Sequence, residues 1–212
     1  MWFGITSKRA EVRAEQIRPA GEGTAFTLVD TGAGEEERFA VTIPTAGNHT
    51  VYDALAAYAG DNTTVIYEAE NVERITELAK DADAIVVSVG EPSYQHDPPW
   101  GYDTLEITPS QQEILEAAVA SGKPVITVVT GGRPYILTWC DEHTNAILEA
   151  YYPGSQGGIA IAETLYGINN PTGRTPMQFP RDMESVNSQE GDVSFDLENP
   201  LYDYGWGLSY GK

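Results

Sequence analysis

The chain has 212 residues, 41% of them hydrophobic, so it can bury one substantial core with at most a small appendage. Its 12 basic and 32 acidic residues give a formal charge of −20, which disfavours nucleic acid and anionic membrane as partners. No apolar run approaches the roughly 20 residues of a membrane span, and the first residues lack a signal-peptide pattern, so we expect a soluble protein of unassigned location. An acidic, lysine-poor composition suits a halophilic source as well as an ordinary acidic protein.

The first 47 residues have β character. Two short patterns, Ala25–Val29 and Arg38–Ile43, flank a polar Gly/Glu stretch and predict a hairpin, which is marginal alone and must pack on something. From Val51 the apolar period changes to that of a helix, and this helix is expected to stop at Gly60.

Strand and helix patterns then alternate along the chain. The expected elements are a strand (Thr64–Tyr67), a helix (Val72–Ala79), a strand (Ala84–Val89), a helix (Ser110–Ala120) and two strands (Val125–Val129, Ala146–Ala150). Thr108, Pro109 and Gln111 supply a hydroxyl cap, a first-turn proline and a capping-box amide. Strands that are apolar on both faces and alternate with helices indicate a doubly wound, mostly parallel α/β sheet covered by helices on both faces.

Ligands of such sheets gather outside the carboxyl ends of the strands. The loop after Val89 is dense in carboxylates and aromatic rings, which sugar sites use for hydroxyl hydrogen bonds and for covering the apolar face of a pyranose. The candidates for binding a carbohydrate are Glu91, Tyr94, Trp100 and Asp103, and His96 and Asp97 are candidates for proton transfer. The alternative is a surface loop whose aromatic side chains pack on its own domain.

Four blocks occur in an order that resembles the C-terminal α/β-sandwich domain of glycoside hydrolase family 3. They are DADAIVVSVGEPSYQHD, GKPVITVVTGGRP, AYYPGSQGGIAIAETLYGINNPTGRTPMQFP and NPLYDYGWGLSY, and the resemblance covers about residues 50–210. It implies that Arg133 can tie its turn to a carboxylate and that the Gly157–Gly158 pair lets a helix start close to the sheet.

The resemblance also implies half of a β-glucosidase site. Many family members carry a Glu, the general acid/base, where this chain has His96 beside Asp97, so either of these is a candidate for that role, or the loop has lost it. Retaining glycosidases need a second carboxylate, which the family places in an N-terminal (β/α)8 barrel. No Ser-Asp-Trp-like motif of that barrel occurs in this sequence, and 212 residues cannot hold both domains.

We therefore expect an accessory domain that is inactive alone and works with a barrel partner. The alternative is a non-catalytic scaffold, natural or engineered, that keeps the fold without sugar turnover. No cofactor or metal is expected, because Cys140 and His143 supply only half of a metal site.

Residues 1–57 instead resemble part of the central domain of Mur ligases, through the sequence GNHTVYDALAA. The two resemblances overlap on one helix, which suggests a chimera with a boundary between segments 1–47 and 48–212. Ligase activity is not expected, because the chain lacks a phosphate-binding G-x-x-x-x-G-K-[ST] loop.

Overall fold

A computed structural model gives the protein as two compact units, Met1–Val65 and Ile66–Lys212. The sequence placed its domain boundary earlier, at residues 47 and 48. In the first 50 residues the description is limited to the backbone of three strands. The residues that the structure describes are 12–20, 23–30, 37–43, 54–59, 63–66, 68, 71–91, 104–190 and 195–210.

The first unit contains a three-stranded antiparallel sheet in the order β1 (Val12–Ala20), β2 (Gly23–Asp30) and β3 (Glu37–Ile43). The predicted hairpin is confirmed as β2 and β3, which pair from Thr24 with Ile43 to Asp30 with Glu37. Strand β1 was not predicted, since VRAEQIRPA mixes charges and a proline with its apolar residues. Such a composition is typical of an edge strand, which is the place that β1 takes.

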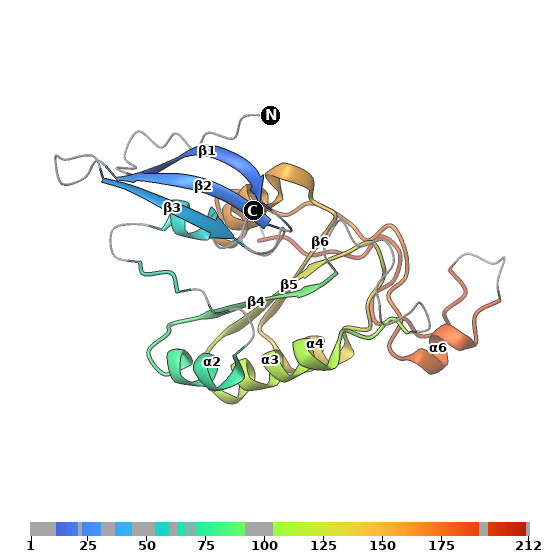
Figure 1. Cartoon of the computed structure of the whole chain (residues 1–212). Coiled ribbons are helices and arrows are strands. Elements are labelled where there is room, and N and C mark those ends of the chain that lie inside the picture. The colour runs from blue at the N-terminus through green and yellow to red at the C-terminus, as the bar shows by residue number, and fades with distance from the viewer. Residues whose placement is uncertain are drawn as a thin grey trace. The chain divides into compact units, whose positions relative to one another are not determined.

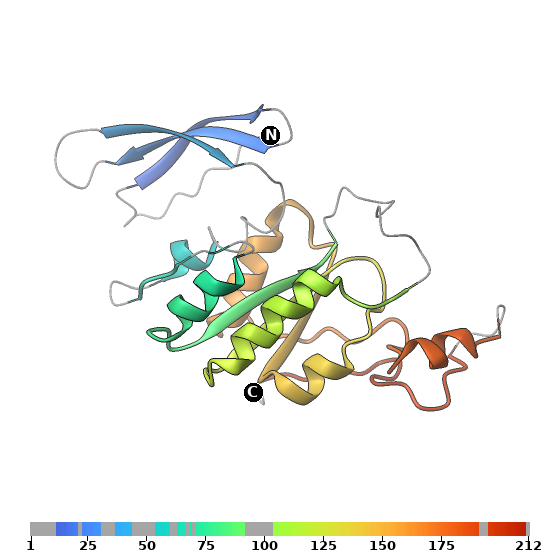
Figure 2. The same cartoon turned by 60° about the horizontal axis from the view of Figure 1, so that its bottom comes forward.

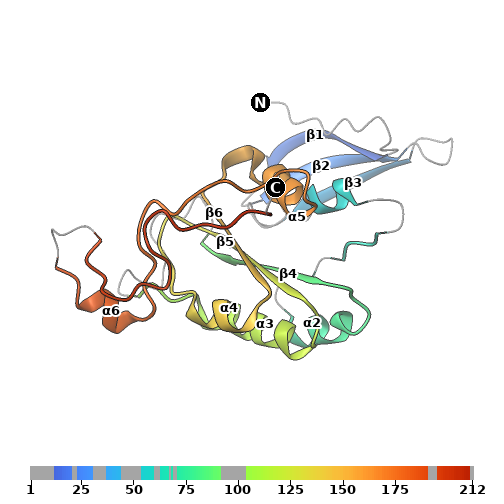
Figure 3. The same cartoon turned by 180° about the vertical axis from the view of Figure 1, so that it is seen from behind.

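The second unit is built on a parallel sheet in the order β4 (Ile85–Gly90), β5 (Val125–Thr130) and β6 (Ala146–Tyr151). Helices α2 (Val72–Ala79), α3 (Pro109–Ala120) and α4 (Thr138–His143) lie on one face, and α5 (Gly157–Leu165) lies on the other (Figures 1 and 3). Figure 2 shows the first three in front of the strands. The predicted α/β fold with helices on both faces is therefore confirmed.

The start of α3 shows how local sequence and tertiary contacts combine. Thr108 caps the helix by accepting a hydrogen bond from the Gln111 N–H at 3.4 Å, and Pro109 occupies the first turn, as predicted. The Gln111 side chain does not complete a capping box. Its amide donates to the Gly90 carbonyl at 2.8 Å and accepts from the Gly90 N–H at 3.3 Å. Gln111 thereby satisfies the outer edge of β4, where no described strand pairs.

The core of this unit lies between the sheet and helices α3 and α4. Leu115 and Ala118 of α3 are fully buried against the valines of β4 and β5. The buried members of the cluster are Val87, Val89, Leu115, Ala118, Val125, Val129, Tyr135, Leu137, Cys140 and Phe179.

The strand predicted at Thr64–Tyr67 is wrong, because residues 63–66 form no strand. Their β-branched side chains favour an extended chain, yet Ile66 is 62% exposed, so burial does not support a strand there.

Two further segments complete the second unit. Helix α6 (Met183–Asn187) projects beyond the sheet, and the segments around Phe179 and Tyr202 form an antiparallel bridge (Figure 3). Among the described residues no helix has the length and apolar character needed to cross a bilayer.

Candidate functional site

Glu91, the first residue after β4, connects the carboxyl ends of all three parallel strands. Its side chain is buried, with 5% exposed. The Oε1 atom accepts hydrogen bonds from the Tyr152 hydroxyl at 2.6 Å and from the Gly132 N–H at 3.2 Å, and Oε2 accepts one from Arg133 Nη2 at 3.1 Å. Gly132 and Arg133 follow β5 and Tyr152 follows β6, so one carboxylate holds three loops together. We call these four residues the Glu91 clamp.

The electrostatics of the clamp favour an ionised carboxylate. Burial by itself would raise the pKa of Glu91, but the hydrogen bonds from Tyr152 and Gly132, together with the charge of Arg133, hold that pKa below its ordinary value. The same hydrogen bond to Glu91 raises the pKa of the Tyr152 hydroxyl. At neutral pH Glu91 therefore acts as an acceptor and Tyr152 as a donor.

The glycines of the turn after β5 are required by the close approach of two tyrosines. A Cβ atom on Gly132 would lie 2.5 Å from the Tyr152 ring, and one on Gly131 would lie 2.8 Å from the Tyr135 ring. Gly131 also has a φ of +156°, which disfavours other residues. Only small residues at these positions let the turn close over Glu91.

Arg133 makes a second contact across the same region. While Nη2 pairs with Glu91, Nη1 approaches the Thr104 carbonyl oxygen at 3.5 Å. Its guanidinium carbon lies 5.4 Å from the centre of the Tyr135 ring, a cation–π arrangement. The prediction that Arg133 ties its loop to a carboxylate is confirmed, and the carboxylate is that of Glu91.

The candidate residues of the loop after β4 are only in part described. Tyr94, His96, Asp97, Trp100 and Asp103 lie outside the described residues, so their roles stay predictions. Glu91 is described, and its two oxygens already accept three hydrogen bonds from the protein. Its role in substrate binding also stays a prediction.

Two members of this region were missed by sequence reasoning. Tyr152 lies in the AYYPG segment directly after β6, and its place at the carboxyl end of a strand could have identified it. Thr104 contributes its backbone carbonyl, and the type of side chain at a position does not predict a contact of this kind.

Glu149 is a second carboxyl group near the same strand ends, also missed by sequence reasoning. Burial raises its pKa to about 8, even though Oε1 accepts the Tyr151 N–H at 3.0 Å. Its Oε2 atom is buried without a hydrogen-bond partner among the described residues. The pKa values of the two carboxyl groups are thus shifted in opposite directions, because Glu91 is surrounded by donors and Glu149 is mainly desolvated.

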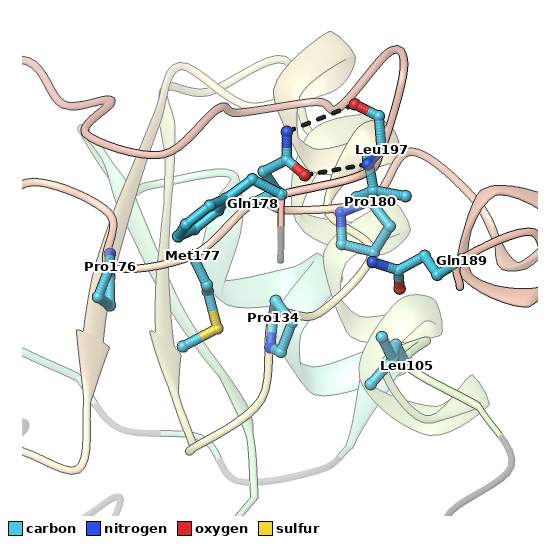
Figure 4. Close-up of a pocket in the computed structure, with 9 residues that line it drawn as sticks. Leu105, Pro134, Pro176, Met177, Gln178, Pro180, Gln189 and Leu197 are labelled. Carbon is cyan, nitrogen blue, oxygen red and sulfur yellow. Dashed lines mark hydrogen bonds between the residues drawn. The ribbon is translucent and has the colours of Figure 1, made fainter. Parts of the chain in front are cut away.

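A hollow of about 360 Å³ opens beside the turn after β5 (Figure 4). Its wall includes Leu105 and Pro134, which directly follow Thr104 and Arg133 in the chain. Gln178 is held in the wall, because its amide donates to the Leu197 carbonyl at 3.4 Å and accepts from the Leu197 N–H at 3.1 Å. The full lining is Leu105, Pro134, Pro176, Met177, Gln178, Pro180, Gln189, Phe195 and Leu197, so seven of these residues are apolar and two are glutamines.

Cys140 is packed in the core, whereas His143 lies on the surface. Cys140 is 1% exposed, and burial raises the pKa of its thiol to about 11. His143 Nδ1 lies 2.8 Å from the Trp139 carbonyl oxygen, and its ring stacks on that of Trp139.

The fold defines a parallel α/β domain in which the loops at the carboxyl ends of the strands meet at Glu91. The glycosyl hydrolase family 3 C-terminal domain model matches residues 13–210, so the chain belongs to that family. A periplasmic β-glucosidase of Salmonella typhimurium is 32% identical over 66% of this chain, and a β-xylosidase of Formosa agariphila is 30% identical over 76%.

Solved structures agree with this assignment. A β-glucosidase involved in saponin metabolism from intestinal bacteria matches 76% of the chain with a TM-score of 0.63 and 27% identity, and the match covers 29% of that protein. A Listeria innocua β-glucosidase in complex with gluconolactone matches 68% with a TM-score of 0.56 and 25% identity, and covers 23% of that protein.

The chain spans only a part of its relatives. The matches cover 20% of the Salmonella protein and 25% of the Formosa protein. The family match also begins within the N-terminal segment, at residue 13. The resemblance of residues 1–57 to Mur ligases, and with it the idea of a chimera, stays a prediction.

Proposed function

We propose that this domain forms one wall of a β-glycoside-hydrolysing site and works with a (β/α)8 barrel domain that supplies the nucleophilic Asp. The observation that carries the proposal is the Glu91 clamp, which gathers the carboxyl ends of β4, β5 and β6 at the residue that precedes segment 92–103 in the chain. The family assignment supports the same role, since relatives named as β-glucosidases match this domain over a fifth of their length.

In this proposal the loop after the clamp handles the proton and the sugar. His96 or Asp97 protonates the leaving glycosidic oxygen, in place of the Glu that many family members carry. Tyr94, Trp100 and Asp103 contact the sugar ring and its hydroxyls. Glu91 contributes at the base of the loop, where its ionised carboxylate is held by Arg133 and Tyr152.

Apolar side chains such as Leu105, Pro134 and Met177 line part of the hollow, and in this proposal they contact the leaving group of an aryl or alkyl glycoside. The expectation for substrate class is therefore a β-glucoside with an apolar aglycone.

Complementation tests the proposal. Activity is assayed with p-nitrophenyl β-glucoside as the substrate in three samples. The first is the 212-residue chain alone, and the second is this chain mixed with the barrel domain of the Salmonella relative. The third is the Salmonella enzyme in which this chain replaces the equivalent domain. We expect turnover only with the barrel. One of the two variants His96→Ala and Asp97→Ala should lower the rate of hydrolysis by about 10²- to 10⁴-fold, because it removes the general acid/base. His143→Ala, at an exposed histidine on α4, is the matched control.

The outcomes separate the functions. Turnover that survives both substitutions contradicts the proton-transfer role of these residues. A folded assembly without any turnover contradicts the catalytic role and favours the second candidate, a non-catalytic scaffold. The specific observation behind that alternative is the His in the position where many family members have a Glu.

A further inference from the structure

The guanidinium of Arg133 contacts the residues on both sides of segment 92–103. Nη2 pairs with the Glu91 carboxylate at 3.1 Å, before the segment, and Nη1 approaches the Thr104 carbonyl at 3.5 Å, after it. We propose that Arg133 is a positioning residue that fixes the separation of Glu91 and Thr104, the described residues on either side of this segment. Its catalytic consequence rests on the function proposed above.

Arginine suits this task because its planar fork presents two terminal nitrogens in a fixed geometry. One nitrogen serves each end of the segment. Lysine keeps the charge but offers a single compact ammonium group, which cannot occupy both nitrogen positions. The fork is itself held, since the Arg133 side chain is 19% exposed and lies over the Tyr135 ring.

The ion pair is better suited to positioning than to stability. The Glu91 side chain is 5% exposed, and the cost of removing two charges from water offsets much of their attraction. Glu91 also does not depend on Arg133 alone, because Tyr152 and Gly132 donate to its other oxygen. The Thr104 hydroxyl accepts the Glu106 N–H at 3.1 Å, but among the described residues no second donor contacts the Thr104 carbonyl, so the release of Arg133 should free this carbonyl first.

Backbone hydrogen bonds next to each end provide separate reporters. The Glu91 N–H donates to the Thr130 carbonyl at 2.9 Å, and the Ile136 N–H donates to the Leu105 carbonyl at 2.9 Å. The first reports on the end at Glu91 and the second on the end at Thr104. Their amide exchange rates can be measured by NMR on the isolated 212-residue chain, without any enzymatic activity.

We expect Arg133→Lys to speed the exchange of the Ile136 amide at least 10-fold while the Glu91 amide changes less than threefold. Arg174→Lys is the matched control, because Arg174 is exposed and its Nη1 contacts the Thr172 and Gly173 carbonyls of its own turn. It should change neither rate. Equal rates at Ile136 in the protein and its Arg133→Lys variant would overturn the proposal.

Kinetics of the barrel-complemented enzyme supply the second readout. Arg133→Lys should lower kcat at least 10-fold, shift the pH profile of kcat and leave KM within threefold. Added guanidinium should partly restore the kcat of Arg133→Ala. A wild-type kcat and pH profile in Arg133→Lys would refute the positioning role in catalysis. If the complemented enzyme shows no turnover at all, the proposed function fails, and the amide exchange still decides whether Arg133 holds the two ends.

Discussion

Replacing Glu149 by Gln should make the stability of the protein less dependent on pH. Burial raises the pKa of this carboxyl group from its ordinary 4.5 to about 8 in the folded protein. The buried Oε2 atom has no hydrogen-bond partner among the described residues that would favour its charge. The amide of Gln keeps the shape and the acceptor for the Tyr151 N–H, but it does not ionise.

The magnitude follows from proton linkage. Because the folded state binds the proton more tightly than the unfolded state, ionisation of Glu149 opposes folding. This penalty is absent well below pH 4.5, grows as the pH rises from 4.5 to 8, and is then constant. The shift corresponds to about 3 kcal/mol at pH 7 and about 5 kcal/mol above pH 8, as an upper value. The Gln variant has no ionisable group at this position and should not show this penalty.

Urea unfolding at pH 5, 7 and 9, at constant ionic strength, measures the effect. The Gln variant should match the protein within about 1 kcal/mol at pH 5 and exceed its free energy of unfolding by up to about 5 kcal/mol at pH 9. Fluorescence and near-UV circular dichroism must give one transition before the data are fitted as two-state. Glu142→Gln, at an exposed position, controls for the lost charge. A constant difference between the Gln variant and the protein across this pH range would refute the reasoning.

Three other substitutions or reagents test the packing of the same unit. Leu115→Ala should lower the free energy of unfolding by about 2–5 kcal/mol in urea titrations, because the side chain is fully buried, whereas Ile168→Ala on the surface should change it by less than about 0.5 kcal/mol. Gly132→Ala should destabilise the protein through the clash with the Tyr152 ring, and pairing it with Tyr152→Ala should recover part of the loss; strict additivity would argue against the clash. Cys140 should react with a thiol reagent far more slowly in the native protein than in urea, and equal rates would contradict its burial.

The order of strands and helices could be predicted from the sequence because its signals are local. Apolar runs at β4, β5 and β6 and the capping residues Thr108 and Pro109 are short-range patterns that the structure confirms. The same local reasoning placed a strand at Thr64–Tyr67, where residues 63–66 form none, and missed the charged edge strand β1. Local patterns record propensity, while pairing decides which extended segments become strands.

The candidate site depended more on contacts between distant residues. The sequence drew attention to Glu91 and to the turn containing Arg133, and it indicated that this arginine could meet a carboxylate. It could not show that Tyr152 completes the clamp, or that Arg133 reaches the Thr104 carbonyl, since these partners come from separate loops. The opposite pKa shifts of Glu91 and Glu149 likewise depend on which donors surround each buried carboxyl group.

The sequence by itself determined the family and the α/β class, because ordered motifs and periodic apolar residues can be recognised in the chain alone. It also singled out segment 92–103 as a candidate for the chemistry. Only the tertiary structure decided how the ends of that segment are held. Three strands that are separate in the chain finish side by side in the fold, and their adjacency brings Glu91, Arg133 and Tyr152 within hydrogen-bond distance.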